Sequence, residues 1–120
     1  MSVTSSLMAG LFLVVLSSAA STAVAQGRCQ PIRFDAGRSS AEVRGSAPAE
    51  DVVCFTLATG NGQTAKLRVS GRNVIFSVLD IADARDNLEF KTRQRTYTIR
   101  VGQLMRAVQN EAFVLSVSVN

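Results

Sequence analysis

The chain holds few side chains that could do acid–base or nucleophilic chemistry. It contains no histidine, so the usual general base and the usual zinc ligand are both absent. The serine pair Ser39-Ser40 lacks the flanking glycines of a G-x-S-x-G nucleophile elbow. Gly60-Asn61-Gly62 is typical of a turn rather than of a phosphate-binding loop. The sequence therefore predicts a protein that is not an enzyme, with no catalytic residue, metal ligand set or cofactor.

Four acidic residues are spaced by three positions along one segment: Asp80, Asp83, Asp86 and Glu89. A calcium loop normally places its carboxylates closer together, as in D-x-D-x-D. Paired carboxylates could also serve glycoside hydrolysis, but nothing else in the chain suggests a sugar-processing cleft. We favour a solvated loop over residues 80–87 whose charges pair in part with Arg85 and Lys91. A loop cation site is the alternative.

Basic residues are dense in the same part of the chain. All but two of the 13 basic residues are arginine, a side chain that favours planar, bidentate contact with carboxylates or phosphates. Six basic residues fall between positions 85 and 106, namely Arg85, Lys91, Arg93, Arg95, Arg100 and Arg106. They indicate either a binding face for an anionic partner or a solvated strand face. Nucleic acid is disfavoured, because the chain is predicted to be exported and its single tyrosine, Tyr97, has an inward-facing position.

Export is predicted from the first 25 residues, which carry no charged side chain. An apolar run from Leu7 to Leu16 is followed by small residues that end on Ala23-Val24-Ala25, an A-x-A cleavage pattern. A run of about ten apolar residues is too short to span a bilayer, which needs about 20. Residues 1–25 are therefore predicted to be a cleaved signal peptide. Residues 26–120 are predicted to form one periplasmic or secreted domain without a membrane span.

Two cysteines remain in the mature chain, Cys29 and Cys54. In an oxidising compartment a disulfide is their expected state. It would close a loop of about 25 residues and contribute about 3–4 kcal/mol in the chain-entropy model. A metal or redox pair is the alternative, and the absence of histidine and of C-x-x-C spacing argues against it.

The mature chain reads as short runs of alternating apolar and polar residues, separated by turn residues. Such runs are found at 30–34, 40–44, 52–57, 65–70, 74–79, 88–91, 96–101 and 113–119. About seven to eight short alternating strands are typical of an all-β fold, here a small antiparallel β-sandwich. Asn61-Gly62 predicts a hairpin turn. Only Gly102 to Ala112 could be helical.

The alternation also predicts where the two cysteines point. Ile32 and Phe34 face the core in the first run, and Cys29 is out of phase with both of them. Cys54 is likewise out of phase with the inward Phe55. Because successive side chains of a strand point to opposite faces, both sulfurs are expected on the outer face. A bridge there would join the first strand to its partner without using core volume.

Four segments of the mature chain together resemble one known family. They are Phe34 to Ala41 with Gly45, Gly62-Gln63 leading into Leu67 to Ser70, Asn73 to Val78, and a closing segment. The closing segment is Tyr97 to Val101, Leu104 to Ala107 and Phe113 to Val117, similar to Y-x-I-x-V…M-R-x-A…Y-x-L-x-V. These segments resemble the bacterial periplasmic inhibitors of g-type lysozyme. They resemble more loosely the pre-peptidase C-terminal domains, which are β-sandwiches of similar size.

The resemblance implies an exported binding protein whose partner is a g-type lysozyme or another envelope protein. A lysozyme cleft carries acidic catalytic residues, so a rigid sandwich with arginine on its loops could plug that cleft. We expect Arg93, Arg95 and Arg106 to be the partner-binding residues. Ser39 and Ser40 are further candidates.

Two loops depart from that family. Residues 93–96 (RQRT) stand where family members often have Ser-Gly before the tyrosine of the closing strand. The loop after Met105-Arg106 is shorter and lacks a second arginine. The alternative function is a general cell-envelope module that binds anionic polymers or another protein. Polymer binding through several charges would fall steeply with salt, because salt screens exposed charges.

Overall fold

The computed structural model describes residues 28–120, and the predicted signal peptide lies outside the described residues. Within this range the chain forms nine strands and no helix, and so it holds no helix long and apolar enough to cross a membrane. The strands are β1 (Gln30–Pro31), β2 (Ser40–Ala47), β3 (Val53–Thr59), β4 (Thr64–Ser70), β5 (Val74–Val78), β6 (Ala82–Arg85), β7 (Asn87–Lys91), β8 (Arg95–Gln103) and β9 (Glu111–Val119). The predicted all-β class is confirmed.

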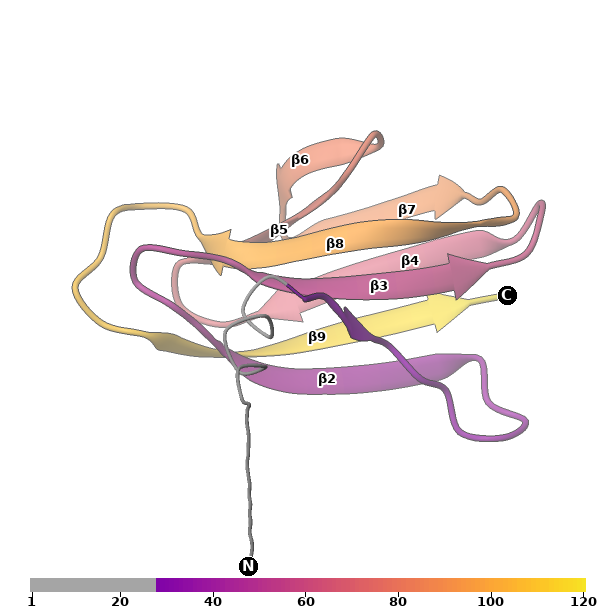
Figure 1. Ribbon diagram of the computed structural model, residues 1–120, viewed down its shortest axis with the longest axis horizontal. Helices are drawn as coiled ribbons and strands as arrows, with labels where there is room; N and C mark the ends of the chain where they lie inside the picture. Colours follow the sequence, from indigo (N-terminus) through magenta and orange to yellow (C-terminus); the bar gives the residue numbers. More distant parts are fainter. Residues whose placement is uncertain (1–27) are drawn as a thin grey trace, which may run out of the picture.

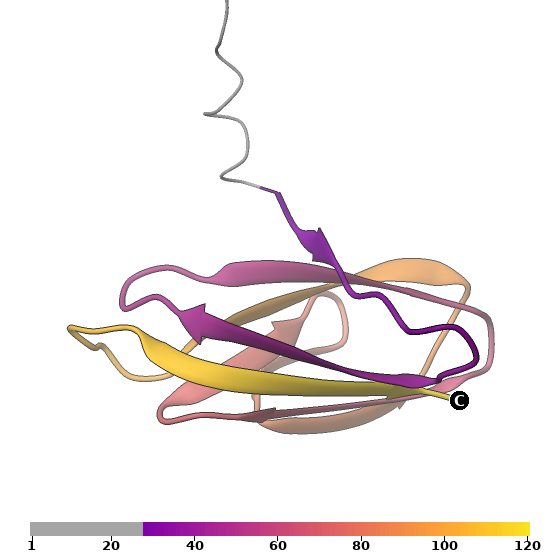
Figure 2. The ribbon, with the colours of Figure 1, turned by 90° about the horizontal axis from the view of Figure 1, so that it is seen from below.

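The strands form two sheets that pack face to face (Figure 1). One sheet has the order β1-β3-β8-β5-β6, and the other has the order β2-β9-β4-β7. Neighbouring strands are antiparallel except β1 and β3, which run parallel. The parallel pair arises because the chain crosses from β1 to β2 in the other sheet before it returns to β3 (Figure 2). The predicted β-sandwich is confirmed.

Most consecutive strands lie in different sheets. In the described chain only β5 and β6 follow one another directly and also pair. The hairpin predicted at Asn61-Gly62 is therefore wrong, because this turn leads from β3 to β4 in the opposite sheet. Gly62 does adopt the left-handed conformation of a tight turn, with φ 72°. An Asn-Gly pair specifies a sharp turn, but the burial of the flanking strands decides whether they pair.

The core lies between the two sheets and follows the predicted alternation. Leu57, Phe76, Ile99 and Leu115 are fully enclosed. The rest of the buried apolar set is Ile32, Ala47, Phe55, Ala65, Leu67, Val69, Val74, Val78, Tyr97, Val101, Phe113, Val117 and Val119. The rings of Phe55 on β3 and Phe113 on β9 meet edge to face across the two sheets, with centroids 6.3 Å apart.

Three segments differ from the sequence prediction. The first strand is confined to Gln30–Pro31. Residues 80–87, expected as a loop, contain β6, whose pairing with β5 is interrupted by a bulge. Ala84 in β6 has φ 49°, so the local backbone breaks the two-residue alternation that would have marked a strand. The stretch 102–112 is not helical, because β8 continues to Gln103 and β9 begins at Glu111.

Cys29 and Cys54 form the predicted disulfide, with their Cα atoms 4.5 Å apart. The bridge joins the residue before β1 to β3. Cys54 lies opposite the exposed Arg100 of β8, whereas the next residue, Phe55, points into the core. The bridge is therefore on the outer face of the five-stranded sheet, as the alternation predicts.

Candidate functional site

The three predicted partner-binding arginines lie at or just beyond the two ends of β8, and the two ends of β8 lie at opposite ends of the sandwich (Figure 1). Arg93 and Arg95 lie where the chain enters β8, and Arg106 follows the end of β8 at Gln103. A strand rises about 3.3 Å per residue, so the 9 residues of β8 place its ends about 26 Å apart. The structure therefore does not bring the three guanidinium groups into one surface. We call the two ends of the sandwich the Arg93 end and the Arg106 end.

The two predicted serines lie at the Arg93 end but on the far side of the sheet. Ser40 begins β2 and pairs with Ser118, close to the end of β9. The loop that carries Arg93 leaves from β7, and β9 and β4 lie between β2 and β7. Three strand spacings correspond to about 14 Å. Ser39 and Ser40 thus share an end with Arg93 without adjoining it.

Thr92, which is buried, fixes the loop that carries Arg93. Its Oγ1 donates a hydrogen bond to the carbonyl of Gly60 at 2.8 Å and accepts one from the amide of Gln63 at 3.1 Å. Its own amide donates to the carbonyl of Gln63, and its carbonyl accepts from the amide of Gly62, both at 2.8 Å. The β7–β8 loop is therefore held firmly against the β3–β4 turn.

Arg95 is already engaged by its own chain. Its guanidinium carbon lies 4.6 Å from the centre of the Tyr97 ring, and its Nη2 lies 3.4 Å from the carboxylate of Asp80. The Tyr97 hydroxyl accepts a hydrogen bond from the amide of Arg93 at 3.0 Å. An incoming partner would have to replace these contacts before Arg95 could bind it.

The acidic series does not gather into one site. Asp80 lies in the β5–β6 turn, Asp83 on β6, Asp86 between β6 and β7, and Glu89 on β7. No group of three potential metal ligands is found within residues 28–120. The predicted pairing of these acids with Arg85 and Lys91 is wrong. Among the described residues, only Asp80 of this series forms an ion pair, and its partner is Arg95.

At the Arg106 end, the β8–β9 loop is tied down by Asn73 from the β4–β5 turn. The Asn73 side chain donates to the carbonyl of Met105 and accepts from the amide of Met105, both at 2.9 Å. The carbonyl of Asn73 accepts from the amide of Leu104 at 2.9 Å. Asn73 has φ 61°, a left-handed conformation that asparagine tolerates better than most residues. The Asn73 side chain therefore bonds to the amide and carbonyl of Met105 as the backbone of a neighbouring strand would.

Gln103 provides the second attachment of the same loop. Its Nε2 donates to the carbonyls of Gln109 at 2.9 Å, Ala47 at 3.1 Å and Pro48 at 3.3 Å. Its Oε1 accepts from the side chain of Asn73 at 2.9 Å. These bonds join three connections of the chain, namely β2–β3, β4–β5 and β8–β9. The base of the loop is therefore rigid although its tip projects beyond both sheets (Figure 1).

The tip of this loop, residues 104–108, exposes apolar side chains around one arginine. Leu104 is 61% exposed, Met105 67% and Val108 98%. Arg106 has no carboxylate within ion-pair distance among the described residues. Large apolar side chains exposed together on a fixed element are typical of a protein contact surface. We call residues 104–108 the loop tip.

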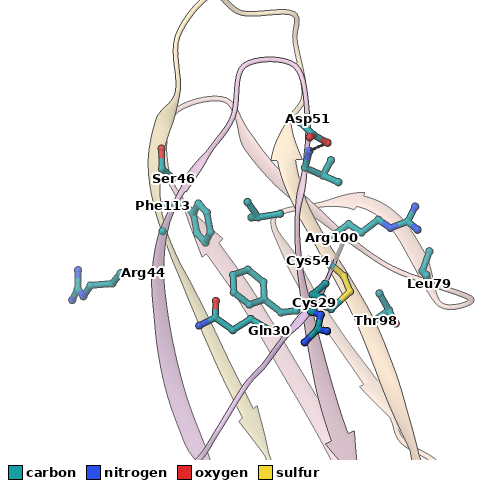
Figure 3. A pocket seen from close by; sticks show the side chains of 15 residues that line it. Cys29, Gln30, Arg44, Ser46, Asp51, Cys54, Leu79, Thr98, Arg100 and Phe113 are labelled. Atoms are coloured by element: carbon teal, nitrogen blue, oxygen red, sulfur yellow. Dashed lines mark hydrogen bonds between the residues drawn. A yellow bond between two sulfur atoms is a disulfide. The ribbon is translucent and has the colours of Figure 1, made fainter. Parts of the chain in front are cut away.

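A groove of about 710 Å³ lies beside the Cys29–Cys54 disulfide, and residues of β2 and β3 line it. Its charged lining residues are Arg28, Arg44, Arg100 and Asp51, and the Asp51 carboxylate accepts a hydrogen bond from the amide of Val52 at 2.7 Å. Figure 3 shows Arg44 and Arg100 on opposite sides of the groove, directed away from each other, with the disulfide between them. The groove carries positive charge, but its arginines do not converge on one point.

These features define a class of protein, a β-sandwich that presents rigid loops and a basic surface, with no assembled catalytic constellation in the described residues. In structure it is similar to periplasmic lysozyme inhibitors of g-type lysozyme. The inhibitor from Aeromonas hydrophila has a TM-score of 0.67 and 26% identity, over 77% of this chain and 96% of that chain. The inhibitor from Salmonella Typhimurium has a TM-score of 0.64 and 14% identity, over 78% of this chain and 99% of that chain.

A mutant of the Escherichia coli inhibitor of g-type lysozyme aligns with a TM-score of 0.61 and 16% identity, over 75% of this chain and 96% of that chain. At 14% and 16% identity the likeness shows the fold. No protein-family model and no curated protein matches the chain by sequence. The predicted resemblance to the inhibitors of g-type lysozyme is confirmed by these structures.

Sequence reasoning missed the amide residues that fix the loop tip. In the sequence, Asn73 only begins one of the segments that resemble the inhibitors, and Gln103 lies in the stretch that could have been helical. The signal that was available is the position of Asn73 after Gly71-Arg72, where a left-handed residue is common. The contact between Asn73 and Met105 joins residues 32 positions apart, and no local pattern reports such a contact.

Proposed function

We propose that the mature protein is a periplasmic binding protein that inhibits a lysozyme, and that its target is a g-type lysozyme. The observation that carries this proposal is the shared fold, which extends over 96% of the Aeromonas hydrophila inhibitor at 26% identity. The similar structures are inhibitors rather than enzymes. The chain supplies no histidine for acid–base work, which further favours binding over catalysis.

The loop tip is the surface that we propose for the target. Its base is held by the side chains of Asn73 and Gln103, so docking requires little ordering of the loop, which favours affinity. Leu104, Met105 and Val108 offer apolar area at the centre of such a contact. Anchoring residues of this kind usually carry most of the binding energy of an interface.

Arg106 is the residue that we expect to meet the acidic centre of the cleft. Glycoside hydrolases place carboxylic acid side chains on either side of the scissile bond. A guanidinium can bind a carboxylate through two parallel hydrogen bonds, and Arg106 has no ion-pair partner among residues 28–120 that it would have to leave. Once desolvated by the neighbouring apolar side chains, such a pair binds more strongly than an exposed one.

The roles predicted for Arg93, Arg95, Ser39 and Ser40 remain predictions. These residues lie at the other end of the sandwich, where Arg95 is held by Asp80 and Tyr97. A target that occupied the loop tip alone would leave them free. Arg93 provides a matched control for Arg106, because both are exposed arginines and they lie at different ends of the sandwich.

A titration of the purified mature protein against g-, c- and i-type lysozymes tests the proposal. We expect stoichiometric loss of g-type activity and little or no effect on the other two types. Inhibition that persists in high salt would support a cleft filled by buried contacts, since salt screens exposed charges most. Failure to inhibit any of the three lysozymes would contradict the proposed function.

A second candidate function rests on the basic groove beside the disulfide. Arg28, Arg44 and Arg100 line it, with one carboxylate that is already hydrogen-bonded. A cell-envelope module that binds an anionic polymer could use such a surface. Its binding should weaken steeply as salt rises, because several separate charges would contribute. A polyanion that binds only at low salt, combined with no lysozyme inhibition, would favour this function.

A further inference from the structure

The mature chain carries few side chains that a mild oxidant can attack. The sequence has three methionines, and Met1 and Met8 lie in the predicted signal peptide, so Met105 is the single methionine of the mature chain. Cys29 and Cys54 are joined in a disulfide, and the described residues contain no free cysteine. The sequence has no tryptophan. A mild oxidant is therefore offered one reactive sulfur, the thioether of Met105.

This thioether lies where an oxidant can reach it in the folded protein. Met105 is 67% exposed at the loop tip. Its amide and carbonyl are both bonded to the side chain of Asn73, so its backbone is fixed while its side chain meets solvent. A methionine in the core would react only when the fold opened locally. Met105 needs no such opening.

The reaction of the thioether with hydrogen peroxide is a two-electron oxidation. The O–O bond of the peroxide breaks, one oxygen forms an S=O bond with the Met105 sulfur, and the other leaves as water. The sulfur is oxidised and the peroxide is reduced. Methionine sulfoxide reductases reverse the change, since the sulfoxide oxygen leaves as water while a dithiol is oxidised to a disulfide.

The sulfoxide alters the part of the molecule that is proposed to meet the target. A thioether is apolar and adapts to the surface that it packs against, whereas a sulfoxide is polar. Met105 stands beside Leu104 and Arg106, and all three side chains are exposed. A sulfoxide oxygen that is buried against the target without a hydrogen-bond donor weakens the contact.

The fold itself does not depend on the thioether. The hydrogen bonds that hold residue 105 in place are made by its backbone, and its side chain is mostly exposed. Oxidation therefore changes the chemistry of the loop tip and leaves its position unchanged.

We propose that Met105 is a modification site, at which oxidation by a peroxide weakens the binding of the target to the loop tip and enzymatic reduction restores it. This inference rests on the proposed function, because the loop tip is the surface proposed for the lysozyme. It adds a reversible control of that surface by oxidants.

Peroxide treatment of the purified mature protein, followed by mass measurement and an inhibition assay, tests the proposal. The peroxide is removed before a g-type lysozyme is added, so that the enzyme itself is not oxidised. We expect one added oxygen, about 16 Da, on the peptide that contains Met105, with an unchanged melting temperature. The inhibition constant should rise about 10- to 100-fold, because a polar group left unpaired in an interface weakens binding to this extent.

Reduction provides the second measurement on the same sample. Treatment with both methionine sulfoxide reductases and a dithiol should return the mass and the inhibition constant to their starting values. The dithiol without the reductases is the control for reduction of the Cys29–Cys54 disulfide, and it should leave the oxidised protein a weak inhibitor.

Two variants separate oxidation at the loop tip from oxidation elsewhere, each compared with itself before and after peroxide. Met105→Leu lacks the sulfur, so its mass and its inhibition constant should not change. Met105→Leu/Ile81→Met moves the single thioether to the β5–β6 turn, where Ile81 is 40% exposed. This turn carries Asp80, which pairs with Arg95 at the start of β8, away from the loop tip. The double variant should gain one oxygen and keep its inhibition constant.

Wild-type protein that gains the oxygen and keeps its inhibition constant would overturn this inference and leave the proposed function intact. An equal loss of inhibition in Met105→Leu/Ile81→Met would also overturn it, as would a folded wild-type protein that takes up no oxygen at Met105. Wild-type protein that inhibits no g-type lysozyme before oxidation would overturn the proposed function, and this inference with it.

Discussion

The arginines of the chain differ in what already holds them. Arg95 contacts the carboxylate of Asp80 and the face of Tyr97, whereas Arg93 and Arg106 form no ion pair among the described residues. Of these three arginines, Arg106 is the one that stands among the exposed apolar side chains of the loop tip. An arginine that becomes desolvated on binding contributes more than one at a wet rim. Arg93, Arg95 and Arg106 look equivalent in the sequence, but their contacts in the structure give them different capacities to bind a partner.

This difference predicts unequal effects of two matched substitutions. Arg106→Ala should weaken binding to g-type lysozyme by about 2–5 kcal/mol, because it leaves a buried carboxylate without its partner. Arg93→Ala should have a far smaller effect. Both substitutions should leave the free energy of unfolding within about 0.5 kcal/mol of wild type, because both side chains are exposed. Inhibition assays and urea melts measure the two quantities, and equal losses of binding would contradict a site at the loop tip.

At the scale of elements, the loop tip depends on the turn between β4 and β5. Asn73 supplies side-chain bonds to Met105 and Gln103 and also takes a left-handed conformation. Asn73→Ala removes the bonds and places an alanine at a positive φ, so it should cost about 1–3 kcal/mol of stability.

Asn73→Gly is the control that separates the two effects, because glycine accepts the backbone conformation but lacks the amide. Both variants should lose inhibition, since both release the loop, and the alanine variant should also melt at a lower temperature than the glycine variant. Full inhibition by Asn73→Gly would show that the rigid base is not needed for binding.

Elements with a regular alternation could be predicted from the sequence, and irregular ones could not. The core strands β4, β5, β8 and β9 place Leu67, Phe76, Ile99 and Leu115 inward as the pattern indicates. β6 was missed because Ala84 takes a positive φ at a bulge. The pairing of strands was also beyond the pattern, because β3 and β4 follow a tight turn but belong to different sheets.

The candidate site was harder to predict than the fold for a related reason. Arg95 and Arg106 are near neighbours in the sequence, and their proximity suggested one surface. An extended strand converts a short separation in sequence into a long one in space. Arg95 begins β8, and Arg106 follows its end at Gln103. A binding surface on a β-sandwich is therefore assembled from different loops at one end, here by contacts such as that of Asn73 with Met105.

At the scale of the whole molecule, the disulfide fastens the residue before β1 to the beginning of β3. β1 has 2 residues, too few to hold the start of the chain by strand pairing alone. The bridge spans 25 residues of sequence and adds a covalent tie to β3. Loss of such a tie frees the unfolded chain and costs about 3 kcal/mol in the chain-entropy model. Cys54 is the second residue of β3, but the side chains that fix the loop tip are those of Asn73 and Gln103, so loss of the bridge should lower stability more than binding.

One preparation tests both the bridge and the proposed export. Protein from the periplasm, denatured and alkylated without reduction, should have the mass of an unlabelled chain that begins at Gln26, because the oxidising compartment keeps Cys29 and Cys54 paired. The variant Cys29→Ser/Cys54→Ser should unfold at lower urea, with about 3 kcal/mol less stability, and should still inhibit g-type lysozyme at temperatures where it is folded. A full-length mass would contradict the cleaved signal peptide, and two alkyl labels would contradict the disulfide.

Equal stability of the variant and the wild type would mean that β1 is held by its packing, through the buried Ile32, rather than by the bridge.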